Sequence, residues 1–223
     1  MHRHLRRWLL GLLLALLLSA GASAASVDAV YINCTVAEDG AASYSMAVTC
    51  RFESLEKSFT IPLAGEKVSG VSVSGASWAL ETQDGWNRVV LRSSDGFIGR
   101  QTLVVNWRSP APSGEGYALP LISSRWEADI AELTFDVQLP APLESAPVMT
   151  SGYSGELNGA ATLTDLGFSG SLPDGLMAHE ALSAALTLPD GYFSRPQLRT
   201  LLSLDWGLVF MALLAVLCVV YWL

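Results

Sequence analysis

Apolar and polar residues alternate with a period of two along most of the chain between residues 30 and 188. Because successive side chains of a strand point to opposite faces of a sheet, each alternating run predicts a half-buried β-strand. The dipeptide Asp39-Gly40 separates the first two runs as a hairpin, and Gln83-Asp84-Gly85 separates two later ones. The runs predicted as strands cover residues 30–36, 44–52, 58–63, 67–74, 78–82, 86–92, 101–107, 126–139, 147–151, 160–166 and 181–188.

About ten strands at this spacing predict an all-β fold, namely an antiparallel β-sandwich of immunoglobulin-like or related type that covers residues 25–195. A second, smaller β-subdomain beginning near residue 109 or 140 is an alternative. The apolar phase of the longest run changes between Ile130 and Leu133, so we expect a bulge or a separate strand start there. Between residues 25 and 204, only the segment 196–204 has a helical pattern.

Two apolar segments flank this region, and the first has the order of a secretory signal. Residues 1–24 begin with a basic stretch that holds three arginines, continue with an apolar stretch too short for an ordinary membrane span, and end in Ala-Ser-Ala. We expect a signal helix that is cleaved after Ala24 or Ala25. A retained N-terminal anchor is the alternative.

The second apolar segment, residues 205–223, predicts one transmembrane helix. Asp205 can cap its first turn, and the 18 uncharged residues that follow extend about 27 Å, enough for a hydrocarbon core. Trp206 and Trp222 are placed like interfacial aromatic residues, although a buried core helix is the alternative. No Lys or Arg follows the segment, where an inner basic flank is usual. Either the chain ends inside the inner interface or a cytoplasmic part is missing, and we favour the second.

The net charge of the chain limits the classes of partner that it can bind. Removal of the signal would leave 10 basic and 21 acidic residues, a net charge of −11. Such a chain lacks the excess of Lys and Arg that neutralises phosphates, so nucleic acid is excluded as a partner, as is anionic lipid bound through a basic face. The remaining partners are the membrane itself, which anchors the chain, and other envelope proteins. We expect a single-pass protein of the cytoplasmic membrane whose β-domain lies outside the cytoplasm.

Cys34 and Cys50 lie on the apolar faces of the first two predicted strands and would meet an oxidising compartment after export. They oppose each other directly only if paired residue numbers sum to 84, which requires a loop longer than a two-residue turn at Asp39-Gly40. A disulfide is the favoured prediction, and two buried thiols in a tighter register are the alternative. Cys218 lies within the predicted span, where we expect it to pack against neighbouring groups; acylation of its thiol is the alternative.

Residues with catalytic chemistry are sparse. His179 is the only histidine after the signal, so the chain has too few histidines for a histidine-rich metal site and only one candidate for a Ser-His-Asp triad. The stretch 152–156 resembles a nucleophile elbow but lacks the final glycine, and a Ser/Gly-rich loop explains it better. His179 and the adjacent Glu180 could form an acid–base pair, but an exposed loop histidine is the simpler interpretation.

Two further patterns have simple explanations. Glu53 and Glu56 could serve a glycosidase as paired carboxylates, although a solvated strand end accounts for them. Asn33-Cys34-Thr35 matches a glycosylation acceptor, a pattern short enough to arise by chance. We therefore predict no catalytic, cofactor-binding or metal site, and no cofactor.

Three stretches share motifs with a known family. They are the hairpin that turns at Asp39-Gly40, the run 126–140 in which Trp-x-x-x-Ile leads into an alternating strand closed by Leu-Pro, and the strand 181–193 before the membrane. Together they resemble the bacterial predicted membrane proteins of the domain of unknown function (DUF) 2207 family over residues 27–223. The resemblance implies an extracytoplasmic β-domain followed by transmembrane and cytoplasmic parts, with no established activity. This chain departs from the pattern by stopping in its first span and by its cysteine pair.

The sequence thus predicts a non-enzymatic, membrane-anchored β-domain of the bacterial cell envelope that acts in binding, sensing or assembly. The alternative is a cell-envelope carbohydrate hydrolase that uses Asp and Glu residues.

Overall fold

The computed structural model describes residues 25–112, 117–152 and 155–193, and these residues form strands and turns without a helix. The all-β prediction is confirmed for this part of the chain. The predicted signal segment 1–24, the segment 196–204 and the predicted transmembrane helix 205–223 lie outside the described residues. Within the described ranges, no helix is long and apolar enough to cross a membrane.

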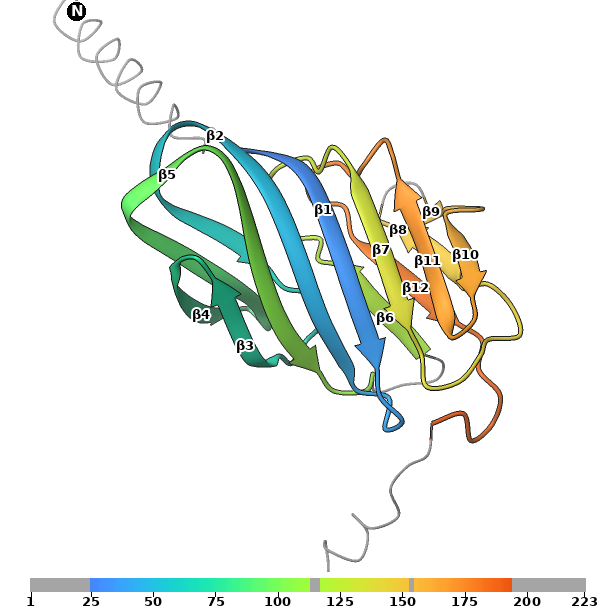
Figure 1. The fold of residues 1–223 in the computed structure, drawn as a ribbon. Coiled ribbons are helices and arrows are strands. Elements are labelled where there is room, and N and C mark those ends of the chain that lie inside the picture. The colour runs from blue at the N-terminus through green and yellow to red at the C-terminus, as the bar shows by residue number, and fades with distance from the viewer. Residues whose placement is uncertain (1–24, 113–116, 153–154, 194–223) are drawn as a thin grey trace, which may run out of the picture.

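The described strands form two sheets, and Figure 1 shows the smaller one behind the larger. The larger sheet has the order β10-β11-β7-β1-β2-β5-β3, and β4 pairs with β5. Its strands are β1 (Ala25–Val36), β2 (Ala42–Pro62), β3 (Ser69–Ser74), β4 (Ser77–Gln83), β5 (Trp86–Ser109), β7 (Leu133–Gln138), β10 (Ala161–Thr164) and β11 (Gly167–Leu172). The smaller sheet, in the order β6-β12-β8-β9, contains β6 (Tyr117–Ile122), β8 (Val148–Ser151), β9 (Gly155–Glu156) and β12 (Leu182–Leu186).

β1 and β2 form an antiparallel hairpin in which Val36 pairs with Ala42 and Cys34 with Tyr44. The loop between them is closed by a hydrogen bond from the Ala37 amide to the Ala41 carbonyl, at 2.8 Å. We call the edge of the sheet where β1 begins the Ala25 end, and the edge where β1 finishes the Val36 end.

β2 and β5 each cover two of the predicted strands, because each continues through a bend instead of ending there. They pair along most of their length, and the register shifts on both sides of Glu56. In Figure 1 both strands curl over at the Ala25 end, so that their outer halves and β4 fold away from the plane of the larger sheet. Gly96 permits this bend, since its φ of +82° lies in the left-handed region that favours glycine.

β7 pairs with β1 in parallel, so the expectation of a wholly antiparallel fold is wrong at this pair. The path of the chain before β7 explains this parallel pairing. The Tyr117 hydroxyl donates to the Gly40 carbonyl at the Val36 end, and β6 runs from there toward the Ala25 end. The chain therefore enters β7 from the end where β1 begins. The strand predicted over 126–139 is reduced to β7, and Ile130 forms isolated bridges to Val27 and Leu176.

One hydrophobic core holds residues of both sheets. The apolar faces predicted for the first two strands are buried, as expected from their alternation: Val30, Ile32, Cys34, Val36, Tyr44, Met46, Val48, Cys50 and Phe52. Trp107, Leu119 and Phe135 belong to the same core. The core therefore continues through the stretch 109–140, where a subdomain boundary was the alternative.

Candidate functional site

A pocket of about 250 Å³ lies between the end of β8 and the segment that follows β11. Apolar side chains form much of its wall, Asp174 is exposed, and Glu180 is only 4% exposed. The pocket therefore combines apolar walls with a buried carboxylate. Its lining residues are Ser151, Leu157, Leu172, Pro173, Asp174, Gly175, Leu176 and Glu180.

Hydrogen bonds hold the segment 175–180 against the segment 126–130. These bonds are the Ile130 amide to the Leu176 carbonyl at 2.8 Å, the Leu176 amide to the Ile130 carbonyl at 2.9 Å, the His179 amide to the Trp126 carbonyl at 2.7 Å, and the Ala178 amide to Asp129 Oδ1 at 2.7 Å. Since Ile130 also bridges to Val27, the pocket lies at the Ala25 end of the molecule.

The carboxylate of Glu180 is fixed by the turn that precedes it. The Met177 amide donates to Glu180 Oε2 at 3.1 Å, and the Glu180 amide donates to the Met177 carbonyl at the same distance. Gly175 has φ +65°, and an ideal Cβ there would overlap the Ile130 carbonyl oxygen. Only glycine allows this close approach, so the backbone around the pocket depends on Gly175.

His179 and Glu180 lie in different environments. His179 is exposed, as the sequence predicted for a loop histidine, and has φ +65°. Glu180 is buried and belongs to the pocket wall, which sequence reasoning missed. No pattern in the sequence marks this burial, because it follows from the hydrogen bonds between two segments about 50 residues apart.

The other predicted candidates do not come together. Tyr153 and Ser154 of the elbow-like stretch lie outside the described residues. Glu53 is exposed, whereas Glu56 is half-buried and accepts a hydrogen bond from the Ser54 hydroxyl at 3.1 Å. Asn33 lies on β1, opposite Ser45 and Asp136. Among the described residues, no group of three or more His, Cys, Asp or Glu could hold a metal ion.

Cys34 and Cys50 do not form the disulfide that the sequence favoured. Cys34 lies opposite Tyr44 and Cys50 opposite Val27, which places them roughly 20 Å apart along the hairpin, against about 4.4–6.8 Å between the Cα atoms of a disulfide. Both are free and buried. The physical reason is the loop, which sets the tighter register given as the alternative. Burial raises the pKa of each thiol to about 12.

An aromatic cluster surrounds Cys34 at the Val36 end. Tyr44 stacks on Trp107 with ring centroids 4.7 Å apart, and the Trp107 indole donates to the Ala64 carbonyl at 3.1 Å. Burial raises the pKa of Tyr44 and also that of Tyr117. The ring of Phe193, the last described residue, lies 4.8 Å from that of Tyr117. The cluster therefore fixes the C-terminal side of the domain at the Val36 end.

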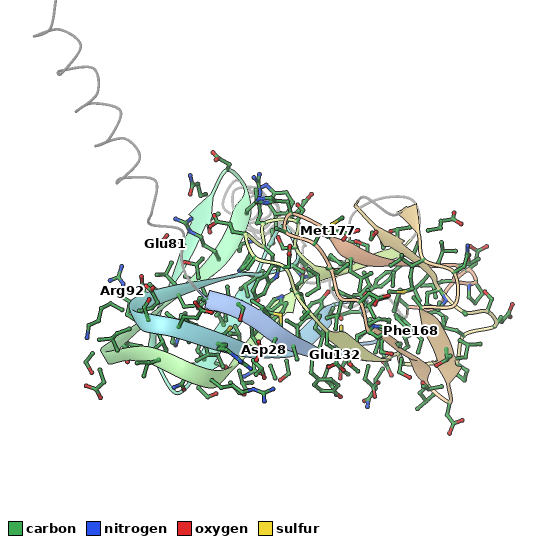
Figure 2. The ribbon with its side chains drawn as sticks, turned by 90° about the horizontal axis from the view of Figure 1, so that it is seen from above. Asp28, Glu81, Arg92, Glu132, Phe168 and Met177 are labelled. Carbon is green, nitrogen blue, oxygen red and sulfur yellow. The ribbon has the colours of Figure 1, made fainter. Side chains whose placement is uncertain are left out.

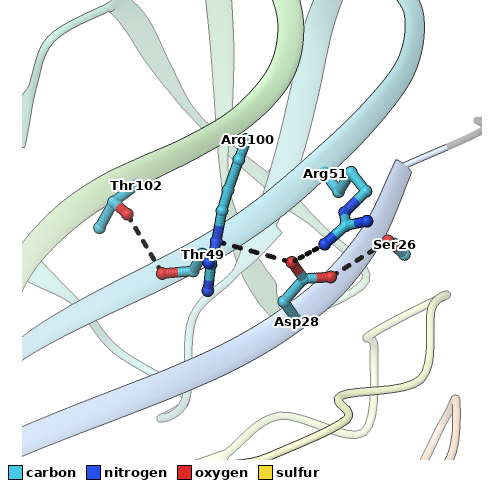
Figure 3. Close-up of polar contacts among 6 residues, drawn as sticks. All are labelled: Ser26, Asp28, Thr49, Arg51, Arg100 and Thr102. Carbon is cyan, nitrogen blue, oxygen red and sulfur yellow. Dashed lines mark hydrogen bonds and ion pairs between the residues drawn. The ribbon is translucent and has the colours of Figure 1, made fainter.

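A polar cluster lies on the surface of β1, β2 and β5 (Figure 3). Asp28, the extra residue at a register shift in β1, accepts from Arg51 at 3.4 Å and lies 3.7 Å from Arg100 Nε. Thr49 and Thr102 share a hydrogen bond of 3.1 Å. The arginine side chains are 60% and 67% exposed, so these pairs join neighbouring strands with little energy. Sequence reasoning missed the cluster because it depends on the bulge.

Comparisons with known proteins give only distant matches. No protein-family model matches the chain, and no curated protein matches it. Native leukotriene A4 hydrolase from Saccharomyces cerevisiae is similar with a TM-score of 0.44 and 14% identity, over 74% of this chain and 30% of that chain. An M1 zinc metallopeptidase from Deinococcus radiodurans has a TM-score of 0.44 and 12% identity, over 74% of this chain and 43% of that chain. The chain thus spans less than half the length of these proteins, and the likeness is too distant to carry an argument about function.

Proposed function

We propose that the chain is an exported β-sandwich, immunoglobulin-like or related, that residues 205–223 anchor in the cytoplasmic membrane and that binds or senses partners outside the cytoplasm. The observation that carries the proposal is that the two ends of the domain, next to the two apolar segments, lie at opposite ends of the larger sheet. The resemblance to the DUF2207 family points the same way.

The two ends are placed by their contacts. Ala25 pairs with Phe52 at the start of β1, whereas Phe193 packs on Tyr117, whose hydroxyl binds the Gly40 carbonyl beyond the other end of β1. The 12 residues of β1 separate these ends by about 36 Å. Figure 1 shows the same arrangement, with the N-terminal side at the top and the C-terminal side at the bottom.

This separation favours removal of the signal. If residues 1–24 stayed in the same bilayer as residues 205–223, both ends of β1 would be connected to one membrane, and the eleven residues 194–204 could make the second connection to an upright domain only if almost fully extended. Cleavage after Ala24 leaves β1 whole, and cleavage after Ala25 removes one paired residue. The mature domain then stands on its Val36 end, and the Ala25 end faces away from the membrane.

Two observations support a binding domain of sandwich type. Both sheets contribute to a single core, as the two sheets of a sandwich do. The pocket beside Glu180 lies at the Ala25 end, where a partner outside the membrane would meet it. Apolar walls with a few fixed polar groups are typical of ligand pockets, which is why we propose recognition as the role of this surface.

The side of the membrane on which the domain lies is testable with a cysteine placed on β10. Thr164 is exposed, whereas Cys34 and Cys50 are buried. In spheroplasts that produce the Thr164→Cys chain, a membrane-impermeant maleimide should label the protein before lysis, and the protein should stay in the membrane fraction. The unmodified chain measures background labelling. Labelling that requires lysis, or recovery of the chain in the soluble fraction, would overturn the proposal.

A further inference from the structure

We propose that Asn158 is a site of spontaneous covalent modification, at which the side-chain amide is converted to a carboxylate through a cyclic imide formed with the Gly159 nitrogen. The other reactant is water, and no enzyme takes part. The modification goes beyond the binding function proposed above, because it occurs whether or not the pocket holds a ligand.

Asn158 and Gly159 are the two central residues of a turn between β9 and β10. The Leu157 amide donates to the Met149 carbonyl at 2.8 Å, and the Ala160 amide donates to the Leu157 carbonyl at 3.4 Å. Gly159 has φ +77°, and a positive φ at the third residue is typical of a type II turn. The amide that closes the turn is thus that of Ala160 and not that of Gly159.

Both central residues of the turn are open to solvent. Asn158 and Gly159 are exposed, and apart from its chain neighbours no atom lies within 4 Å of an ideal Cβ on Gly159. The ring closes only after rotation about the Cα–C bond of Asn158 brings the Gly159 nitrogen to the side chain. This rotation disturbs the Ala160 hydrogen bond, which at 3.4 Å is longer than is usual for an N–H donor. The native turn therefore opposes the reaction only weakly.

The reaction balances with water alone. The Gly159 nitrogen gives its proton to a base and forms a bond to Asn158 Cγ, while the Cγ–Nδ2 bond breaks and the side-chain nitrogen leaves as ammonia. Water then adds to one of the two carbonyl carbons of the five-membered ring. Cleavage of the bond from nitrogen to Cγ gives aspartate, and cleavage of the bond from nitrogen to the main-chain carbon gives isoaspartate. Either product carries one more negative charge than asparagine.

The other three asparagines of the chain lie in strands. Asn87 is 6% exposed, and its side-chain nitrogen donates to two main-chain carbonyls. Asn33 and Asn106 each have a paired strand on both sides, which holds their backbone extended. Each of the three precedes a residue whose side chain crowds the attacking nitrogen, whereas Gly159 has no side chain. Asn158 is therefore the asparagine that the fold protects least.

The modification takes place next to the pocket, because Leu157 belongs to the pocket wall. Isoaspartate continues the chain through Cβ and Cγ, so it adds one methylene group to the main chain between Leu157 and β10. The new carboxylate lies within residues 126–193, which contain ten acidic residues and neither Lys nor Arg. Like charges repel one another, so the longer main chain and the added charge both act against the native turn.

Incubation of the full chain in detergent micelles at pH 8, followed by peptide mapping at increasing times, tests the proposal. A glutamate-specific protease cuts after Glu156 and Glu180, and the peptide between them should gain about 1 Da and become a substrate for isoaspartyl methyltransferase. This change should be at least about tenfold faster than at Asn33 or Asn106, whose neighbours have side chains. Gly159→Ala is the matched control: its methyl group enters open space and should slow the change about tenfold.

The chain unfolded in guanidinium chloride sets the time scale of the experiment. Three results would overturn the proposal: an unchanged native peptide at times when the unfolded chain has reacted, equal rates at Asn158 and Asn106, or an unchanged rate in Gly159→Ala. If Gly159→Ala fails to fold, Asn158→Gln keeps the glycine of the turn. Its peptide should stay unmodified, because the longer side chain would have to close a six-membered ring, and a peptide that changes at the native rate would also overturn the proposal.

Discussion

Two regions of the molecule are stabilised in different ways. They are the long-strand region, residues 25–112, and the short-strand region, residues 117–193. In the first, β1, β2 and β5 have 12, 21 and 24 residues, whereas no strand of the second exceeds six. The first has seven Lys and Arg against nine acidic residues, and the second has Arg125 alone against ten. Even Arg125 lies over the Trp86 ring of the long-strand region, 4.8 Å from its centroid.

Figure 2, viewed from above Figure 1, shows Arg92 and Glu81 on the side of the long-strand region and Phe168 on the other. Continuous ladders and cross-strand ion pairs stabilise the first region, whereas turns fixed by close backbone contacts shape the second. The pocket therefore belongs to the region where loops, rather than strands, hold the side chains.

Removal of a large buried side chain should affect the two regions differently. Trp107→Ala should lower the free energy of unfolding by about 3–5 kcal/mol, because it removes a buried ring stacked on Tyr44. Phe168→Ala should cost a similar amount but act locally, because Phe168 packs on Phe135 between short strands. Denaturant unfolding gives the free energies.

Hydrogen exchange then locates the effect. Trp107→Ala should speed exchange throughout the domain, and Phe168→Ala mainly in β7, β10 and β11. Similar exchange profiles for the two variants would show that the regions unfold as one unit, and would end the distinction between them.

The next effect concerns the close approach at Gly175. Gly175→Ala should destabilise the protein by about 2–3 kcal/mol, because its Cβ would overlap the Ile130 carbonyl oxygen at a positive φ. Gly159→Ala is the matched control, since φ is +77° there but no atom lies within 4 Å of an ideal Cβ, and it should cost about 1 kcal/mol. Equal shifts in Tm for both variants would mean that the backbone around the pocket tolerates movement.

The buried thiols of the long-strand region should produce an alkaline loss of stability. Their pKa is about 12 in the folded chain and near 9 when exposed. Between these values the unfolded chain releases its thiol protons first, so the free energy of unfolding falls as pH rises from about 9 to 12. Denaturation at several pH values should show this slope, reduced in the Cys34→Ala, Cys50→Ala double variant.

Alkylation gives an independent readout of the same thiols. At pH 8, iodoacetamide should modify neither Cys34 nor Cys50 until denaturant is added. If neither cysteine reacts after unfolding without a reductant, and both react once dithiothreitol is added, the two residues form a disulfide and the account of two free thiols is wrong.

The smallest effect lies in the surface cluster of the long-strand region. Asp28→Asn should cost less than about 1 kcal/mol, since Arg51 and Arg100 are mostly exposed, and the cost should shrink as salt is added. Chemical denaturation at low and high ionic strength measures it. A loss of several kcal/mol that salt leaves unchanged would mean that Asp28 shapes the bulge in β1 itself.

The sequence predicted the long-strand region better than the short-strand region, and the reason is physical. Alternation over ten or more residues identified the buried faces of β1 and β2. It could not show that β2 and β5 continue through their bends, because the polar residues there interrupt the period of two. β11 was not anticipated, since its glycines break the pattern; Gly167 and Gly170 allow backbone to approach where a Cβ would overlap carbonyl oxygens of Val137 and Ala160.

The site was harder still to foresee. Glu180 stands beside an exposed histidine in the sequence, and its burial depends on contacts of its loop with Trp126 and Ile130. The cysteine prediction failed because register depends on loop geometry, and the loop of residues 37–41 places Cys34 opposite Tyr44. Local patterns thus predict faces of strands, whereas sites depend on how distant segments meet.

We propose that residues 25–193 form an exported domain attached to the membrane by its C-terminal side alone. The intact mass of the chain extracted from membranes with detergent tests this proposal. Cleavage after Ala24 or Ala25 predicts a membrane-bound species lighter than the 23.8 kDa of the full sequence by the mass of its first 24 or 25 residues. A membrane-bound chain that retains the full 23.8 kDa would contradict the claim.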